Sequence, residues 1–183
     1  MLKNLTDEEL VSSILTVTDN KPFMEELYNR YEKQVYYKCM LLSGDKVFAK
    51  DLTQEVFIKV FTKLNTYRGD SKFKYWILRV THNSCLNFLR KKKTAILFEN
   101  IEEESEDAYA EDPEESTEYS VELLKEALKE LDPQEVYLLN LKYAEGMKVH
   151  EIAKVLEIKE SAVKMRLKRL RERLSTILKP HLS

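Results

Sequence analysis

The chain has 183 residues, enough for one or two small domains, and its three glycines and four prolines leave few residues for the tight turns of a β-rich fold. The formal net charge of −2 is unevenly distributed. Residues 1–98 carry 17 basic and 11 acidic side chains, residues 121–183 carry 13 and 10, and Glu99 to Ser120 contains eleven acids and no base. The acidic start lacks the pattern of a secretory signal, and no apolar run approaches the roughly 18 residues of a membrane span, so we expect a cytoplasmic protein with no insertion into a membrane.

The acidic segment 99–120 marks a domain boundary. A run of like charges with few large apolar residues buries too little surface to offset the entropy lost on ordering. We therefore predict an all-α protein of two small helical domains, residues 1–98 and 121–183, joined by an acidic flexible linker.

The first domain is predicted to contain four helices. Thr6 and Glu9 have the spacing of a capping box for the first, and Pro22 opens the second. The third, over residues 46–64, follows from five apolar residues spaced by four: Phe48, Leu52, Val56, Val60 and Leu64. Its opposite face is mostly polar with one isoleucine, as a solvated surface would be. That face comprises Asp51, Gln54, Glu55, Ile58 and Thr62.

A glycine loop precedes the predicted fourth helix, residues 72–92. Two apolar stripes on this helix indicate packing on two sides, and Trp76 belongs to the first of them, which favours a core position. The remaining surface holds four polar residues: Arg79, His82, Asn83 and Arg90. The helix runs into a basic cluster at 90–93, and basic residues beside aromatic ones are typical of nucleic-acid binding.

No catalytic set is evident in the sequence. Two cysteines and three histidines are scattered without the paired spacing of a zinc site, and there is neither a glycine-rich phosphate loop nor a nucleophile elbow. We expect no metal, no cofactor and no enzymatic activity.

The second domain is predicted to end in a helix-turn-helix. Asp132, Pro133 and Glu135 give a capped helix start, and Gly146 gives its stop. Two further helices, from the segments VHEIAKVL and ESAVKMRLKRLRERL, are separated by about three residues, which is the helix-turn-helix spacing. Five residues would lock them together: Ile152, Ala153, Leu156, Ile158 and Val163. On the last helix an apolar arc faces away from a basic surface, a pattern that favours recognition of the DNA major groove.

Both predicted domains resemble a sigma factor of bacterial RNA polymerase, of the two-domain extracytoplasmic-function (ECF) group. The resemblance is carried in order by DLTQEVFIKVF (51–61), YRGDSKFKYWILRVTHN (67–83) and LDPQEVYLLNLKYAEGMKVHEIAKVLEIKESAVKMRLKRLRERL (131–174). It implies a factor that binds core RNA polymerase, recognises promoter DNA and initiates transcription, and that is held inactive by a cognate anti-sigma factor. A free-standing helix-turn-helix regulator and an RNA-processing enzyme are the alternatives.

The resemblance also implies roles for individual residues. On the third helix, the residues that dock on the clamp helices of the largest polymerase subunit would be Asp51, Gln54, Glu55 and Ile58. Capture of an unpaired −10 base would fall to Tyr67, Arg68, Gly69, Asp70, Ser71 and Lys72, with Arg79, His82, Asn83 and Arg90 near the flanking backbone. The −35 element would be read by Ser161, Lys164, Met165, Lys168 and Arg169.

The sequence departs from the family pattern at the helix-turn-helix. The family usually has glycine in the turn and a small polar cap before the last helix, whereas Glu157 and Lys159 stand there in this chain. Met165 replaces a residue that is commonly small and polar. The promoter sequence therefore cannot be transferred from other members.

Overall fold

The structure is a computed structural model that describes residues 2–98 and 127–179, and for residues 91–98 it describes the backbone only. The predicted linker, 99–120, lies outside the described residues. The described residues form helices and no strand, which confirms the all-α prediction. They divide into two compact units, one built on the chain up to residue 99 and one on the helices after residue 100. In the described part, no helix combines the length and apolar character needed to cross a membrane.

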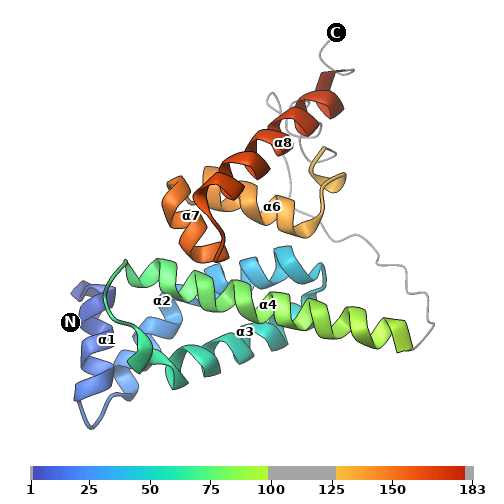
Figure 1. Ribbon diagram of the computed structural model, residues 1–183. Helices are drawn as coiled ribbons and strands as arrows, with labels where there is room; N and C mark the ends of the chain where they lie inside the picture. Colours follow the sequence, from blue (N-terminus) through green and yellow to red (C-terminus); the bar gives the residue numbers. More distant parts are fainter. Residues whose placement is uncertain (1, 99–126, 180–183) are drawn as a thin grey trace, which may run out of the picture. The chain divides into compact units, whose positions relative to one another are not determined.

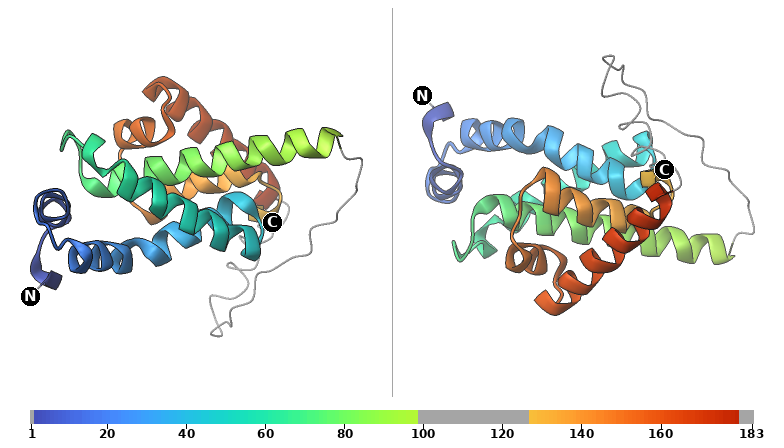
Figure 2. Two further views of the ribbon diagram at one scale, coloured as in Figure 1. Left: turned by 90° about the horizontal axis from the view of Figure 1, so that it is seen from below. Right: turned by 90° about the horizontal axis from the view of Figure 1, so that it is seen from above.

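The first unit is a bundle of three long helices with a short one across it. Helices α2 (Lys21–Ser43), α3 (Lys46–Thr62) and α4 (Phe73–Phe98) pack on one another pairwise (Figure 1). The short helix α1 (Asp7–Thr16), preceded by the 3-10 turn η1 (Leu2–Asn4), packs against α2 and α4. Figure 2 shows α1 nearly end-on beside the beginning of α2. The start of α4 and the loop before it therefore lie within reach of α1.

The helix ends follow from local chemistry. Thr6 and Glu9 form the predicted capping box of α1. Gly44 ends α2 with a φ of 71°, and the Asp45 carboxylate accepts hydrogen bonds from the first amides of α3. The prediction that the third helix reaches Leu64 was wrong by two residues, because the 3-10 turn η2 (Leu64–Thr66) already follows. Leu64 is nevertheless buried, so the spacing of buried apolar residues continues beyond the end of the α-helix.

The core of the first unit lies between the faces that the periodicity predicts. Leu52, Val56 and Val60 of α3 are buried, and so is Trp76 of α4, as expected. The prediction that His82 lies on the surface was wrong, because this residue is only 6% exposed. It stands four residues after Leu78 on the second apolar stripe of α4, so it is buried with that stripe.

The second unit contains the predicted helix-turn-helix. Residues 127–129 are helical, and α6 (Pro133–Leu139), capped by Asp132, continues into the π-helical turn η3 (Asn140–Ala144). Gly146, with a φ of 64°, follows this turn and precedes α7 (Val149–Leu156). The last helix, α8 (Glu160–Leu178), begins four residues after α7 ends and packs on α6. The core of the unit includes Tyr137, Leu138, Leu141, Met147, Ile152, Val163, Leu167 and Leu170.

Candidate functional site

The polar face of α3 is exposed as predicted. Asp51, Gln54 and Glu55 are exposed, and the Ile58 side chain among them is 64% exposed. Glu55 pairs with Lys59 one turn further on. Val47, which the sequence reasoning missed, continues the same stripe at the beginning of the helix and is 68% exposed. The face therefore presents two aliphatic side chains about 16 Å apart along α3, with carboxylates and an amide between them.

The loop at residues 67–72 is closed by its own tyrosine. The Tyr67 hydroxyl donates a hydrogen bond of 2.6 Å to the carbonyl oxygen of Ser71. Its ring packs edge-on against Phe73 and Trp76, at centroid distances of 5.4 and 5.9 Å. Burial, followed by the nearby Glu8 carboxylate, raises the pKa of the Tyr67 hydroxyl and keeps it in its donating form. Tyr67 thus joins the two ends of the loop.

The tip of the loop is exposed. Arg68, Gly69, Asp70 and Lys72 are exposed, and Ser71 is half-buried. Gly69 has a φ of 77°, and a Cβ built there would meet nothing within 4 Å. The glycine is therefore needed for its backbone conformation and not for space. The tip offers two cations and one carboxylate on a short, tightly turned backbone.

Part of the α4 surface extends from this loop. Arg79 and Asn83 are half-buried and Arg90 is exposed. The three share one side of the helix, and about 16 Å separates Arg79 from Arg90 along its axis. His82 does not join them because it is buried on the second apolar stripe.

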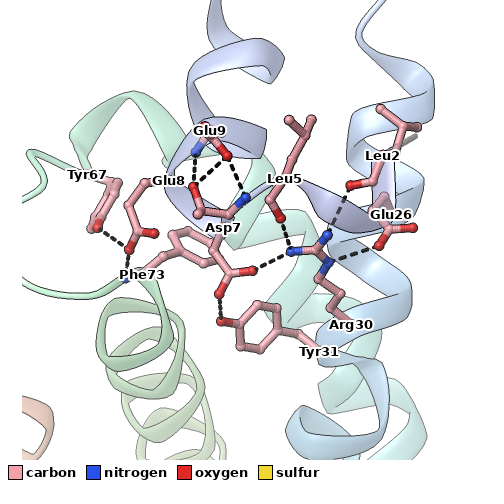
Figure 3. A network of polar contacts seen from close by, with 11 residues as sticks. Leu2, Leu5, Asp7, Glu8, Glu9, Glu26, Arg30, Tyr31, Tyr67 and Phe73 are labelled. Atoms are coloured by element: carbon pink, nitrogen blue, oxygen red, sulfur yellow. Dashed lines mark hydrogen bonds and ion pairs between the residues drawn. The ribbon is translucent and has the colours of Figure 1, made fainter.

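The first helix and a network around Arg30 support the base of this loop (Figure 3). Arg30 donates to Asp7 at 3.0 Å, to Glu26 at 2.9 Å and to the carbonyl oxygens of Leu2 and Leu5. Tyr31 donates to the other Asp7 oxygen at 2.5 Å, and burial together with Asp7 raises the pKa of this tyrosine. The beginning of α1 is thereby fixed to α2. The sequence reasoning missed the contacts of Arg30 and Tyr31 with Leu2, Leu5 and Asp7, because these partners lie more than 20 residues apart in the chain.

The two cysteines lie in the bundle core. The thiols of Cys39 on α2 and Cys85 on α4 are 3.8 Å apart and fully buried, and they form no disulfide with each other. The hydrogen bond between them, followed by burial, raises the pKa of Cys85. Among the described residues, no group of three or more His, Cys, Asp or Glu side chains is arranged to hold a metal ion.

The outward face of α8 has the predicted composition. Val163, Leu167 and Leu170 are buried, and the predicted outward residues are all exposed. These are Ser161, Lys164, Met165, Lys168 and Arg169. Arg173 has a different position, because it donates to Glu135 at 2.8 Å and to the Glu130 carbonyl oxygen, which ties α8 to the beginning of α6.

The turn before α8 shows what the two departures from the family pattern do. Glu157 has a φ of 54° and is the one residue other than glycine with a positive φ in the described parts of the chain. Lys159 occupies the N-cap position of α8 and makes no side-chain capping hydrogen bond. Both side chains therefore stand where the backbone geometry favours other residues.

Comparisons with known proteins agree with this architecture. Residues 27–95 match the family model of Sigma-70 region 2, and residues 122–174 match that of Sigma-70, region 4. The ECF RNA polymerase sigma factor SigE of Mycolicibacterium smegmatis is 31% identical over 185 residues, which cover 97% of this chain and 71% of that protein. The chain belongs to the ECF sigma factors. The ECF RNA polymerase sigma-E factor of Escherichia coli K12 is 29% identical over 193 residues, covering 98% of each chain.

A solved structure supports the fold assignment of this sigma factor. The sigma factor RpoE of Bartonella quintana, crystallised with the anti-sigma factor NepR, superposes with a TM-score of 0.71 at 21% identity, covering 85% of this chain and 96% of that one. The region 2 match to the first unit favours a sigma factor over the alternative of a free-standing helix-turn-helix regulator. As a sigma factor, the protein binds core RNA polymerase and directs promoter recognition and transcription initiation. The region 2 match begins at residue 27, so α1 precedes it.

Proposed function

We propose that the two units divide promoter recognition between them, with residues 1–98 acting on polymerase and the −10 element and residues 121–183 acting on the −35 element. The observation that carries the −35 assignment is the outward face of α8, where cations are exposed on a helix-turn-helix whose opposite face is buried. Lys164, Lys168 and Arg169 supply the charge and hydrogen-bond donors that phosphates and guanine edges accept. Ser161 and Met165 provide a hydroxyl and an apolar contact on the same face.

The α3 face is the proposed docking site for core polymerase. Ile58 and Val47 are exposed apolar side chains on an otherwise polar helix surface. Such residues contribute to binding when a protein partner covers them, while Asp51, Gln54 and Glu55 set its orientation through polar contacts.

The 67–72 loop is the proposed capture site for an unpaired −10 base. Its exposed tip combines the cations Arg68 and Lys72 with the carboxylate of Asp70, so it offers both donors and acceptors to the edge of an extruded base. Arg79, Asn83 and Arg90 extend from the loop along α4 and would follow the flanking phosphates. Tyr67 and Ser71 hold the loop closed.

Regulation by a cognate anti-sigma factor is part of this proposal. A structure of similar fold, RpoE, is a complex with the anti-sigma factor NepR, and another, CnrH, is a complex with the cytosolic domain of CnrY. The protein would act in the bacterial cytoplasm without an enzymatic activity of its own, because its family consists of transcription initiation factors.

Promoter-directed transcription with purified core polymerase tests the proposal. Transcripts that depend on added sigma factor are expected, and replacing Gln54 and Ile58 with charged residues should reduce core binding without lowering the melting temperature. Alanine at Lys164, Lys168 or Arg169 should weaken −35 binding by about tenfold for a base contact. Arg166→Ala is the matched control, because this exposed arginine lies on α8 beside the buried arc. Equal effects of all four alanine variants would contradict the assignment.

A further inference from the structure

A carboxylate from the first helix reaches the beginning of α4. Glu8 Oε1 accepts a hydrogen bond of 3.1 Å from the backbone amide of Phe73, a residue 65 positions further along the chain (Figure 3). Phe73 is the first residue of α4 and follows the 67–72 loop directly. Its amide is one of the donors that a helix leaves without an intrahelical partner, and a negative charge is favourable at this end of a helix.

The same oxygen lies beside the other end of the loop. Glu8 Oε1 is 3.5 Å from the Tyr67 hydroxyl, whose proton is directed to the Ser71 carbonyl oxygen at 2.6 Å. The rings of Tyr67, Phe73 and Trp76 pack around this point. Both ends of the loop thus meet at one carboxylate and one aromatic cluster.

The backbone that carries Glu8 is itself fixed. The neighbouring Asp7 side chain binds Arg30 at 3.0 Å and Tyr31 at 2.5 Å, which anchors this turn of α1 to α2. On the other side, Thr6 and Glu9 complete the capping box. The backbone from which the Glu8 side chain extends is therefore held by contacts that do not involve the loop.

We propose that Glu8 is a positioning residue for −10 recognition. By binding the first amide of α4 beside the Tyr67 hydroxyl, it holds the two ends of the 67–72 loop in the shape that receives the base, without touching DNA. The inference rests on the proposed function of that loop. Because Glu8 precedes the region 2 match at residues 27–95, the shape of the loop depends on a residue outside the segment that defines the family.

Substitutions in the full-length chain test the positioning role. Glu8→Ala removes the carboxylate, Glu8→Gln retains an oxygen that can accept the same hydrogen bond, and Glu25→Ala removes an exposed acid of α2 as the matched control. The first measurement is amide hydrogen exchange at Phe73 in the free protein. The second is binding of the holoenzyme to a promoter it opens, supplied as a fork whose −10 non-template strand is unpaired.

Glu8→Ala should speed exchange at Phe73 and weaken fork binding, each by about tenfold, as expected for loss of a hydrogen bond to a charged group. Glu8→Gln, which keeps a hydrogen-bond acceptor but not the charge, should recover part of both effects, and Glu25→Ala should change neither. Affinity for core polymerase should stay as in the wild type, whereas general loosening of the bundle would lower it together with fork binding. If Glu8→Ala does lower the melting temperature, Glu8→Asp gives the second test, because it keeps the charge but shortens the side chain and should also weaken fork binding.

A variant with a shortened 67–72 loop separates this inference from the function on which it rests. If the shortened loop abolishes fork binding while Glu8→Ala and Glu8→Asp bind the fork as the wild type does, the positioning role is wrong and the function of the loop stands. If the shortened loop also binds normally, the proposed function of the loop is wrong, and the role of Glu8 is rejected with it.

Discussion

Replacing Glu157 with glycine should stabilise the second unit. The backbone of Glu157 is in the left-handed region, with a φ of 54°, where a side chain with a Cβ costs about 1–2 kcal/mol. Glycine removes this cost but gives the unfolded chain more conformational freedom, which offsets about 0.4–1 kcal/mol. The net gain expected for Glu157→Gly is therefore about 0.5–1 kcal/mol.

The matched control is Glu157→Ala, which removes the same carboxylate but keeps the Cβ. Trp76 is the sole tryptophan and lies in the first unit, so tryptophan fluorescence should report the same unfolding for all three proteins. Amide hydrogen exchange at Val163 and Leu167 should report the second unit, whereas circular dichroism records the helices of both units. For a unit of this size, the gain corresponds to an increase of about 4–8 °C in its melting temperature.

The difference in stability between the glycine and alanine variants isolates the cost of a Cβ at this backbone position. If both have the same stability in the second unit, the positive φ imposes no cost that a Cβ explains. If the fluorescence transition shifts as well, the effect does not belong to this turn. Either result would refute the argument from backbone strain.

Three further predictions concern the cap of α8, the contact between Tyr31 and Asp7, and the acidic segment 99–120. Lys159→Thr should supply the missing side-chain cap of α8 and raise the stability of the second unit by about 1 kcal/mol in urea unfolding, whereas an unchanged midpoint would contradict it. Tyr31→Phe should lower the stability of the first unit by about 1–3 kcal/mol, since Asp7 loses a donor, and Trp76 fluorescence will measure this. Replacing the eleven acids of Glu99 to Ser120 with Ser and Gln should raise non-specific DNA binding of the free protein at low salt if the linker shields basic surfaces. If only the affinity for core polymerase or transcript escape changes, the acidic segment is inferred to occupy a basic channel of the polymerase. If nothing changes, the segment acts only as a tether.

Local patterns predicted much of the fold. The capping boxes at Thr6 and Asp132 each involve residues only three positions apart, and both formed as predicted. The apolar spacing on α3 and α8 likewise predicted which side chains are buried, because the periodicity of a helix converts sequence spacing directly into faces. The exposed positions Ile58, Lys164 and Lys168 followed from the same periodicity.

Long-range contacts could not be predicted in this way. An acid in the first turn of a helix is expected to stabilise its own helix, so the sequence gives no sign that Glu8 binds the amide of Phe73. His82 was assigned to the surface because histidine is polar, although its position relative to Leu78 placed it on the apolar stripe. Residue type was the weaker guide in that case, and helical spacing the stronger one.

The protein has two kinds of functional residue, those proposed to contact a partner and those proposed to shape a binding loop, and they differ in how far the sequence predicts them. A side chain that contacts DNA or polymerase must be exposed, and exposure follows from helical periodicity, so Arg169 or Gln54 can be proposed from the sequence. A side chain that shapes a binding loop must instead reach the loop from a separately anchored element. Glu8 does so because Asp7 is anchored on α2. Substitutions at Asp7 or Glu8 are therefore expected to alter the proposed −10 recognition, even though neither residue has to touch the promoter.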